Sequence, residues 1–224
     1  LNLLMQYKDI EKWFDLNLEG TLRNSDSSSH LDKITNYILE NCDFKEGSSI
    51  LEVGCGDGKI LEGIRKKRSD LKISGLDISS NQIDKARLLL PEVEFYEGNF
   101  LETNINKEFD TVFSFSTFQY IKKKDVYRFN EKCLELLSPY GRACHLSIPN
   151  KKLKRLYYYR SLKNKRIKIV AWTLSFIKSL SHKYGKDGSN WHDPIFLKKM
   201  ASKNQITINY PSDSWYRFNF YLIK

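Results

Sequence analysis

A short apolar run passes directly into a glycine-rich turn about a quarter of the way along the chain. Residues 50–53 (Ile-Leu-Glu-Val) have the composition of a short buried strand, and Gly-Cys-Gly-Asp-Gly follows at residues 54–58. A helical pattern then covers residues 59–68. Glycines between a strand and a helix let the backbone approach a ligand at the helix N-terminus. This turn therefore predicts an α/β fold with a ligand site at the end of its first strand.

The glycine spacing and two acidic residues narrow the kind of ligand. Glu52 precedes a turn with GxGxG spacing, and an acid in this place fits a cationic cofactor better than a pyrophosphate. Asp77 ends the next strand pattern, about 20 residues on, where a carboxylate commonly binds ribose hydroxyls. A tight turn and a helix cap would also explain these residues, but the joint pattern favours a cofactor. The same features disfavour a nicotinamide oxidoreductase.

Strand and helix patterns alternate along the rest of the chain. Strand patterns cover residues 50–53, 71–78, 93–96, 109–115, 141–148, 205–209 and 215–223, and helical patterns cover residues 31–41, 59–68, 81–89, 123–137 and 194–202. This alternation predicts a Rossmann-like, seven-stranded, mostly parallel sheet with helices on both faces. The link at residues 210–214 is too short for a parallel crossover, so the final strand is expected to be antiparallel. We expect residues 1–224 to form a single domain.

Five motifs carry a resemblance to a known family. They are LEVGCGDG (residues 51–58), GLDIS (75–79), VEFYEGNF (93–100), FDTVFSFSTFQYI (109–121) and LELLSPYGRACHLSIPN (134–150). In this order and spacing the chain resembles the class I S-adenosylmethionine-dependent methyltransferases over about residues 31–150. The resemblance implies an enzyme that binds S-adenosylmethionine (SAM), releases S-adenosylhomocysteine and needs no metal. It is specific for the fold and the cofactor, not for the methyl acceptor.

The resemblance also implies individual roles. The implied cofactor-binding residues are Glu52, Gly54, Cys55, Gly56, Asp57, Asp77, Ile78, Asn99, Phe100, Ser114, Phe115 and Gln119. The glycine turn with Glu52 and Asp57 would surround the methionine end, and Asp77 would hold the ribose. Ile78, Asn99 and Phe100 would surround the adenine, and Ser114, Phe115 and Gln119 would lie below the sulfonium. Asn99 and Gln119 depart from the family, which more often has Asp and His there.

The acceptor is less well defined by the sequence. The fourth strand pattern ends in SFSTFQYI, without the Asn/Asp-Pro-Pro-aromatic tetrad of amino-methyltransferases that act on nucleic-acid bases. An alcohol acceptor needs a general base. His192, in the loop sequence Trp-His-Asp-Pro, is the best candidate, and His30 is a weaker one. His145, within a predicted strand, is more simply explained by a structural role, and His182, in the basic segment, by a surface position. The alternative for His192 is a role in capping or packing the next helix.

The Trp-His-Asp-Pro loop and the final strand also look like bacterial methyltransferases encoded with surface-polysaccharide genes. This looser resemblance suggests O-methylation of a small-molecule or lipid-linked sugar or sugar-phosphate acceptor. An RNA methyltransferase and a catalytically silent SAM-binding protein remain the alternatives.

Positive charge is concentrated in one segment. Residues 151–190 hold twelve Lys and Arg and one acid, a net charge of +11, whereas the rest of the chain sums to −1. Such asymmetry indicates an anionic partner. We interpret residues 151–190 as a basic helical insertion that is a substrate lid, a peripheral contact with an anionic membrane or, less favoured, a nucleic-acid surface.

Two further features bear on location. The chain has no uncharged apolar run of about 18 residues, which a transmembrane helix would need. Its four cysteines have neither CxxC nor zinc-site spacing, which is typical of free thiols. We therefore expect a cytoplasmic protein, with contact at the inner membrane face as the possible exception.

Overall fold

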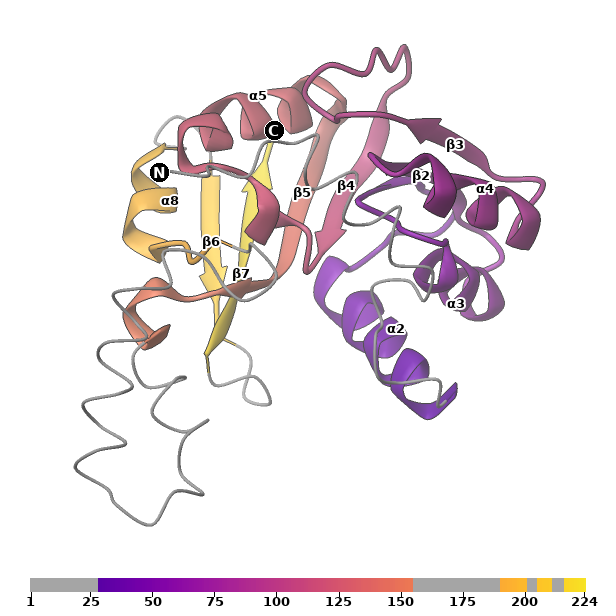
Figure 1. The fold of residues 1–224 in the computed structure, drawn as a ribbon, viewed down its shortest axis with the longest axis horizontal. Coiled ribbons are helices and arrows are strands. Elements are labelled where there is room, and N and C mark those ends of the chain that lie inside the picture. Colours follow the sequence, from indigo (N-terminus) through magenta and orange to yellow (C-terminus); the bar gives the residue numbers. More distant parts are fainter. Residues whose placement is uncertain (1–27, 155–189, 201–204, 211–215) are drawn as a thin grey trace.

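The computed structural model describes residues 28–154, 190–200, 205–210 and 216–224 of the chain (Figure 1). Its strands are β1 (Ser49–Val53), β2 (Lys72–Asp77), β3 (Glu94–Glu97), β4 (Phe109–Phe115), β5 (Leu137–Pro149), β6 (Gln205–Asn209) and β7 (Arg217–Ile223). Its helices are α2 (Ser28–Cys42), α3 (Lys59–Lys67), α4 (Ser80–Leu89), α5 (Val126–Glu135) and α8 (Pro194–Met200), with short 3₁₀ turns η1 (Phe118–Tyr120), η2 (Lys123–Asp125) and η3 (Lys151–Leu153). None of the described helices has the length and apolar character needed to span a membrane.

The described strands form one seven-stranded sheet in the order β3-β2-β1-β4-β5-β7-β6 (Figure 1). The pairs β3-β2, β2-β1, β1-β4 and β4-β5 are parallel, whereas β7 runs antiparallel to both β5 and β6. The predicted Rossmann-like sheet with a reversed final strand is therefore confirmed. The strand order reverses at β1, which has β2 on one side and β4 on the other. Ligands of open α/β sheets bind at the carboxyl ends of the strands at such a point.

Helices cover both faces of the sheet, as predicted. Along β1, Leu51 and Val53 point to one face and Ile50 to the other, because side chains alternate along a strand. Buried residues of α5 and α8 share the core layer of Leu51, and buried residues of α2, α3 and α4 share that of Ile50. The apolar periodicity of these helices is thus explained by two separate core layers.

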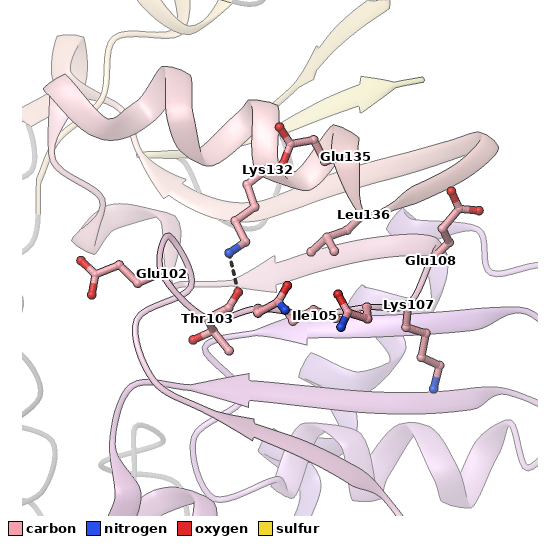
Figure 2. Close-up of a pocket in the computed structure, with 10 residues that line it drawn as sticks. Glu102, Thr103, Ile105, Lys107, Glu108, Lys132, Glu135 and Leu136 are labelled. Atoms are coloured by element: carbon pink, nitrogen blue, oxygen red, sulfur yellow. Dashed lines mark hydrogen bonds between the residues drawn. The ribbon is translucent and has the colours of Figure 1, made fainter.

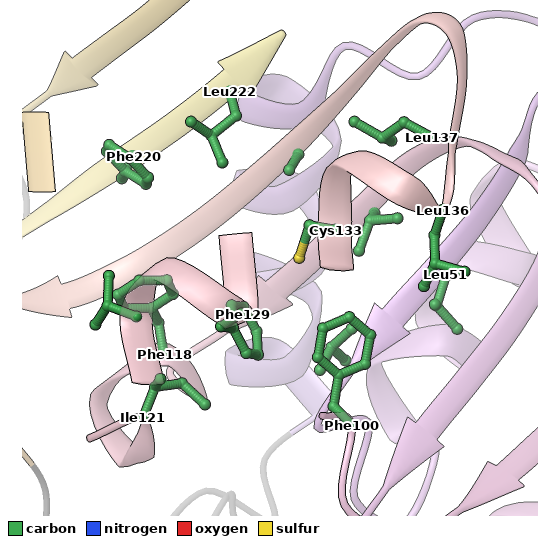
Figure 3. Close-up of a cluster of buried hydrophobic side chains, with 14 of the residues drawn as sticks. Leu51, Phe100, Phe118, Ile121, Phe129, Cys133, Leu136, Leu137, Phe220 and Leu222 are labelled. Atoms are coloured by element: carbon green, nitrogen blue, oxygen red, sulfur yellow. The ribbon is translucent and has the colours of Figure 1, made fainter. Parts of the chain in front are cut away.

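Aromatic side chains fill much of the layer under α5, as Figure 3 shows. The Phe118 ring lies 5.5 Å from the Phe129 ring, and the Phe100 ring lies 4.8 Å from it, centroid to centroid. Tilted and edge-to-face aromatic pairs each add about 0.5–1.5 kcal/mol beyond the area that they bury. This cluster holds the turn after β4 firmly against the sheet.

Most elements match their predicted bounds to within three residues, and the clearest difference lies at the start of β5. The pattern over residues 123–137 predicts one helix stopped by Pro139, but the structure has η2, then α5, and β5 already begins at Leu137. Leu137 pairs with Phe109 of β4, and the register shifts before Thr111. Cross-strand pairing therefore overrides the helical periodicity at Leu136 and Leu137, and Pro139 lies inside the irregular start of a strand.

The described flanks of the basic segment lie side by side. Residues 155–189, most of the predicted insertion, lie outside the described residues. Its two flanks are hydrogen-bonded to each other, since the His192 amide donates to the Pro149 carbonyl (3.0 Å) and the Lys151 amide to the His192 carbonyl (2.8 Å). The chain thus leaves and re-enters at the carboxyl end of β5.

Candidate cofactor site

The glycine turn after β1 requires glycine at more than one position. Gly54, Gly56 and Gly58 have φ values of 81°, 55° and 79°, in the left-handed region that other residues rarely adopt. The Gly54 and Cys55 amides both donate to the Leu76 carbonyl, at 2.6 and 3.0 Å. These bonds hold the turn against the end of β2. The N-terminus of α3 follows directly, which is the arrangement that the sequence predicts.

Asp77, at the carboxyl end of β2, organises this turn. Its Oδ2 accepts a hydrogen bond from the Gly56 amide (2.8 Å), and its Oδ1 accepts one from the Ser79 amide (3.0 Å). A carboxylate has about four lone-pair sites and can therefore accept from several donors at once. Asp77 therefore joins the glycine turn to the start of α4, beside the position where a ribose is expected. The sequence alone does not indicate this structural role.

Glu52 has an unusual environment for an acid. It is fully buried, and neither carboxylate oxygen has a hydrogen-bond partner in the described part of the protein. Burial, and then the charges of Asp77 and Asp57, raise the pKa of Glu52 well above its usual value of 4.5. Asp57 itself pairs with Lys59 at 3.1 Å. A glycine turn that leads into a helix N-terminus, beside three acids, suits a ligand that carries both a carboxylate and a cationic group.

The three residues predicted around the adenine differ in how deeply they are buried. Ile78 and Asn99 are half-buried at the ends of β2 and β3. The Asn99 Oδ1 accepts from the Leu101 amide (3.1 Å), so this side chain also shapes the loop after β3. Phe100 is buried and packs on Phe129, so the structure places its ring in the core rather than open to a ligand.

Cys55 of the glycine turn and Ser114 of β4 also point away from open space. Cys55 is buried close to Gly75, and burial raises the pKa of its thiol. Ser114 is fully buried, and its Oγ lies 3.0 Å from the Nδ1 of His145. His145 is likewise fully buried, as its predicted structural role requires. Of the residues predicted on β4, only Phe115 is half-buried and thus partly open.

The turn after β4 contains a residue, Thr117, that contacts the glycine turn and that the sequence does not mark. The Thr117 Oγ1 donates to the Gly54 carbonyl (3.3 Å), and a methyl group built on Gly54 would lie only 2.3 Å from the Thr117 Cγ2. Gln119, two residues on, is buried, and its carbonyl accepts from the Asn190 amide (2.6 Å). One short turn therefore contacts both the glycine turn and the loop of residues 190–193.

The two histidines predicted as candidate bases lie in different environments. His192 is 3% exposed, its ring lies 5.2 Å from the Phe118 ring, and it bonds to the Phe118 backbone. Its Nε2 has no partner in the described residues, so Nδ1 makes the backbone bond and Nε2 carries the lone pair. Burial lowers the pKa of His192 to about 4. His30 is exposed in the first turn of α2, and no described contact ties it to this site.

A cavity of about 470 Å³ lies elsewhere (Figure 2). It is lined by residues 102–108, by Lys132 and Glu135 of α5, and by Leu136, which follows that helix. The Lys132 amine donates to the Thr103 carbonyl (2.6 Å). None of the predicted site residues lines it. The lining runs to Glu108, at the amino end of β4, whereas the glycine turn and Asp77 lie at the carboxyl ends of β1 and β2. This cavity is therefore not the cofactor site.

A parallel sheet that ends in a reversed strand, with a glycine turn after β1 and an acid after β2, defines a class I methyltransferase fold. Comparison with known proteins agrees with this class. Residues 50–141 match the family model described as a methyltransferase domain. The chain is 30% identical over 115 residues to a malonyl-acyl-carrier-protein O-methyltransferase of Calditerrivibrio nitroreducens, across 51% of this chain and 43% of that protein.

A second curated relative is the dTDP-3-amino-3,4,6-trideoxy-alpha-D-glucopyranose N,N-dimethyltransferase of Streptomyces venezuelae. It is 35% identical over 78 residues, which cover 34% of this chain and 32% of that protein. The chain thus spans a third to two fifths of the length of these relatives. A solved N-methyltransferase of Bradyrhizobium japonicum, in complex with S-adenosylhomocysteine, has the same fold, with a TM-score of 0.64 and 11% identity over 96% of this chain and 98% of that one.

These findings identify the part of the chain around residues 50–141 as a class I SAM-dependent methyltransferase domain. SAM is the cofactor of this class. The glycine turn and the orphaned carboxylate of Glu52 fit its amino-acid end, which carries both an ammonium and a carboxylate.

Proposed function

We propose that this protein transfers the methyl group of SAM to an oxygen of a small-molecule or lipid-linked sugar or sugar-phosphate acceptor. The observation that carries the cofactor part is the pairing of the left-handed glycine turn at the start of α3 with the buried, unpartnered Glu52. When bound, SAM supplies a methyl group activated by a positively charged sulfur. Positioning can account for much of the rate of such a displacement.

The chain's own residues would hold the cofactor in four ways. The amides at the start of α3 would bind the carboxylate of the methionine end, and Glu52 would pair with its ammonium. Asp77 would accept from the ribose hydroxyls while it retains its bonds to the turn. Asn99 and Ile78 would lie along the adenine.

Two kinds of evidence support the acceptor class. One relative is named for malonyl-acyl-carrier protein and another for a dTDP-linked sugar, so both named acceptors carry acidic or phosphate groups. The +11 charge of residues 151–190 agrees with an anionic acceptor. The missing Asn/Asp-Pro-Pro-aromatic tetrad argues against a nucleic-acid base amine.

His192 is the proposed general base. Its Nε2 lone pair and its bond to the Phe118 backbone give the tautomer that accepts a proton from a hydroxyl. The His192 Nε2 is buried in the described structure. A methyl acceptor would therefore reach it only after a small rearrangement of the surrounding residues. Replacement of His192 by Ala should lower turnover by about 10²–10⁴-fold if it acts as the base.

The test is transfer of tritium from methyl-labelled SAM to three separate pools. The pools are nucleotide sugars, lipid-linked sugars from bacterial membranes, and total RNA. The proposal predicts label in either sugar pool, and product analysis then separates methyl ether from methylamine. Label only in RNA would establish the RNA methyltransferase instead. Cofactor binding without label in any pool would establish the silent SAM-binding protein.

A further inference from the structure

Arg217 lies at the carboxyl edge of the sheet, where a methyl acceptor has to meet the cofactor. It is the first residue of β7 and pairs with Pro149 at the end of β5. Its side chain is half-buried, and its guanidinium carbon lies 5.1 Å from the centre of the Tyr216 ring. Arg217 is thus a cation on a rigid strand rather than on a loop.

A bulge in β5 holds this guanidinium. The register between β5 and β7 shifts between His145 and Ile148, and Ser147 has a left-handed φ of 64°. The Ser147 amide donates to the Asn219 Oδ1 (3.0 Å), while its carbonyl and Oγ both accept from the Arg217 Nη1, at 2.5 and 3.3 Å. Bulges of this kind redirect groups beside functional sites.

All of the hydrogen bonds that Arg217 makes in the described structure come from one nitrogen. Besides Ser147, the Nη1 donates to the Gln119 Oε1 (3.4 Å). No described carboxylate lies within ion-pair distance of Arg217. Its Nε and Nη2 are also not among the described polar atoms that are fully buried without a hydrogen-bond partner. The Nε–Nη2 edge of a guanidinium presents two parallel N–H donors, which matches two oxygens of a carboxylate or a phosphate.

Gln119 connects this edge to the rest of the site. Its turn contacts the glycine turn through Thr117, and its carbonyl accepts from Asn190, two residues before His192. An anion bound at Arg217 would therefore lie beside the turn that borders the cofactor and the proposed base.

We propose that the Nε–Nη2 edge of Arg217 binds an oxyanion of the methyl acceptor, a carboxylate or a phosphate, and so selects anionic acceptors. This inference rests on the proposed function, because it assigns the binding of that acceptor. The competing interpretation is that Arg217 only ties the bulge to Gln119. A purely structural arginine would affect folding but would give the protein no affinity for anions.

The test follows the Arg Nε–H resonances of ¹⁵N-labelled protein by NMR, with and without S-adenosylhomocysteine. Malonate is the carboxylate probe and inorganic phosphate is the phosphate probe, each added up to about 50 mM because single-site anion affinities are commonly millimolar. The proposal predicts a saturable shift of the Arg217 signal with at least one probe. The stronger of the two probes identifies the kind of oxyanion.

Three variants complete the test. Arg217→Gln should weaken anion binding at least about tenfold, since it removes two charge-assisted bonds. Arg217→Lys keeps the charge and should retain part of the affinity. Arg142→Gln is the matched control, because Arg142 pairs with Asp43 at the opposite end of β5. Circular dichroism and thermal melting verify that each variant folds.

The outcomes separate this inference from the proposed function. Absence of a saturable Arg217 shift with both probes, or anion affinity of Arg217→Gln within twofold of the wild type, overturns the role of Arg217. If Arg217→Gln does not fold, the anion affinity of Arg217→Lys is compared with that of the wild type instead. An affinity within twofold of the wild type again overturns the role of Arg217. The affinity for S-adenosylhomocysteine is measured separately. If the wild type does not bind S-adenosylhomocysteine, that result counts against the proposed function alone.

Discussion

The acid before the glycine turn is the residue whose placement is hardest to explain without a ligand. Glu52 is fully buried, and its carboxylate has no described donor. A buried polar group without a partner costs about 1–3 kcal/mol of stability. A cationic ligand would compensate part of this cost, so cofactor affinity and intrinsic stability should respond in opposite directions to changes at this residue.

Glu52→Gln tests that relationship, because glutamine has nearly the same shape and cannot ionise. Above pH 4.5 the unfolded chain releases the Glu52 proton, whereas the folded chain keeps it because its pKa is raised. The folded wild type therefore loses stability as pH rises above 4.5, by at most about 1.4 kcal/mol per pH unit. Urea unfolding from pH 5 to 8 should show this slope, relative to the variant. Equal slopes would contradict the assignment, as would unchanged SAM affinity of the variant.

The two buried histidines should make the protein sensitive to acid. Burial lowers the pKa of His145 to about 3 and that of His192 to about 4. Below pH 6.5 the unfolded chain binds protons that the folded chain excludes, so stability falls as pH drops from 6.5 toward 4. His192→Phe keeps a ring against Phe118 and should lessen this loss by about 1.4 kcal/mol per pH unit. Urea midpoints at pH 4.5 and 6.5 measure the difference, and an identical loss in both proteins would refute the shift at His192.

At the scale of elements, the glycine turn and the turn after β4 fit each other closely. Gly54→Ala places a methyl group 2.3 Å from Thr117 and puts alanine at a φ of 81°. We expect it to cost more than about 3 kcal/mol and to lower SAM affinity at least tenfold. Gly47→Ala is the matched control, since Gly47 has a φ of 68° with open space around it and should cost only about 1–2 kcal/mol. Similar losses in the two variants would show that the fit to Thr117 is unimportant.

The sequence predicts the elements better than the contacts between them. The strands over residues 109–115 and 205–209 have the predicted bounds, because their apolar runs are bordered by clear breaks. The contacts of Thr117 with Gly54 and of Arg217 with Ser147 join residues 63 and 70 positions apart. No local pattern marks such partners, so these site residues appear only once the sheet order is known. Phe100 illustrates the same limit, since an aromatic after a strand suits either a ligand or the core, and the structure buries its ring against Phe129.

For the whole molecule, the uneven distribution of charge is the feature that a binding partner would recognise. The net charge of +11 in residues 151–190 predicts attraction to anionic surfaces. Each Lys or Arg near an anionic membrane contributes about 1 kcal/mol, and salt screens this attraction. Neutralising Lys163, Lys165, Arg166 and Lys168 should abolish sedimentation with anionic liposomes at low salt and leave SAM affinity unchanged. Failure of the wild type to bind such liposomes would favour the substrate-lid interpretation.

Calorimetric titration with SAM and S-adenosylhomocysteine tests the central claim most directly. We predict one site per chain, with affinity at least tenfold lower in Asp77→Asn, which loses one of the carboxylate acceptors that hold Gly56 and Ser79. Asp84→Asn is the matched control, since Asp84 is an exposed acid of α4 that pairs only at the surface with Arg87. Absence of binding by the folded wild type, or equal affinity in Asp77→Asn and Asp84→Asn, would contradict the account.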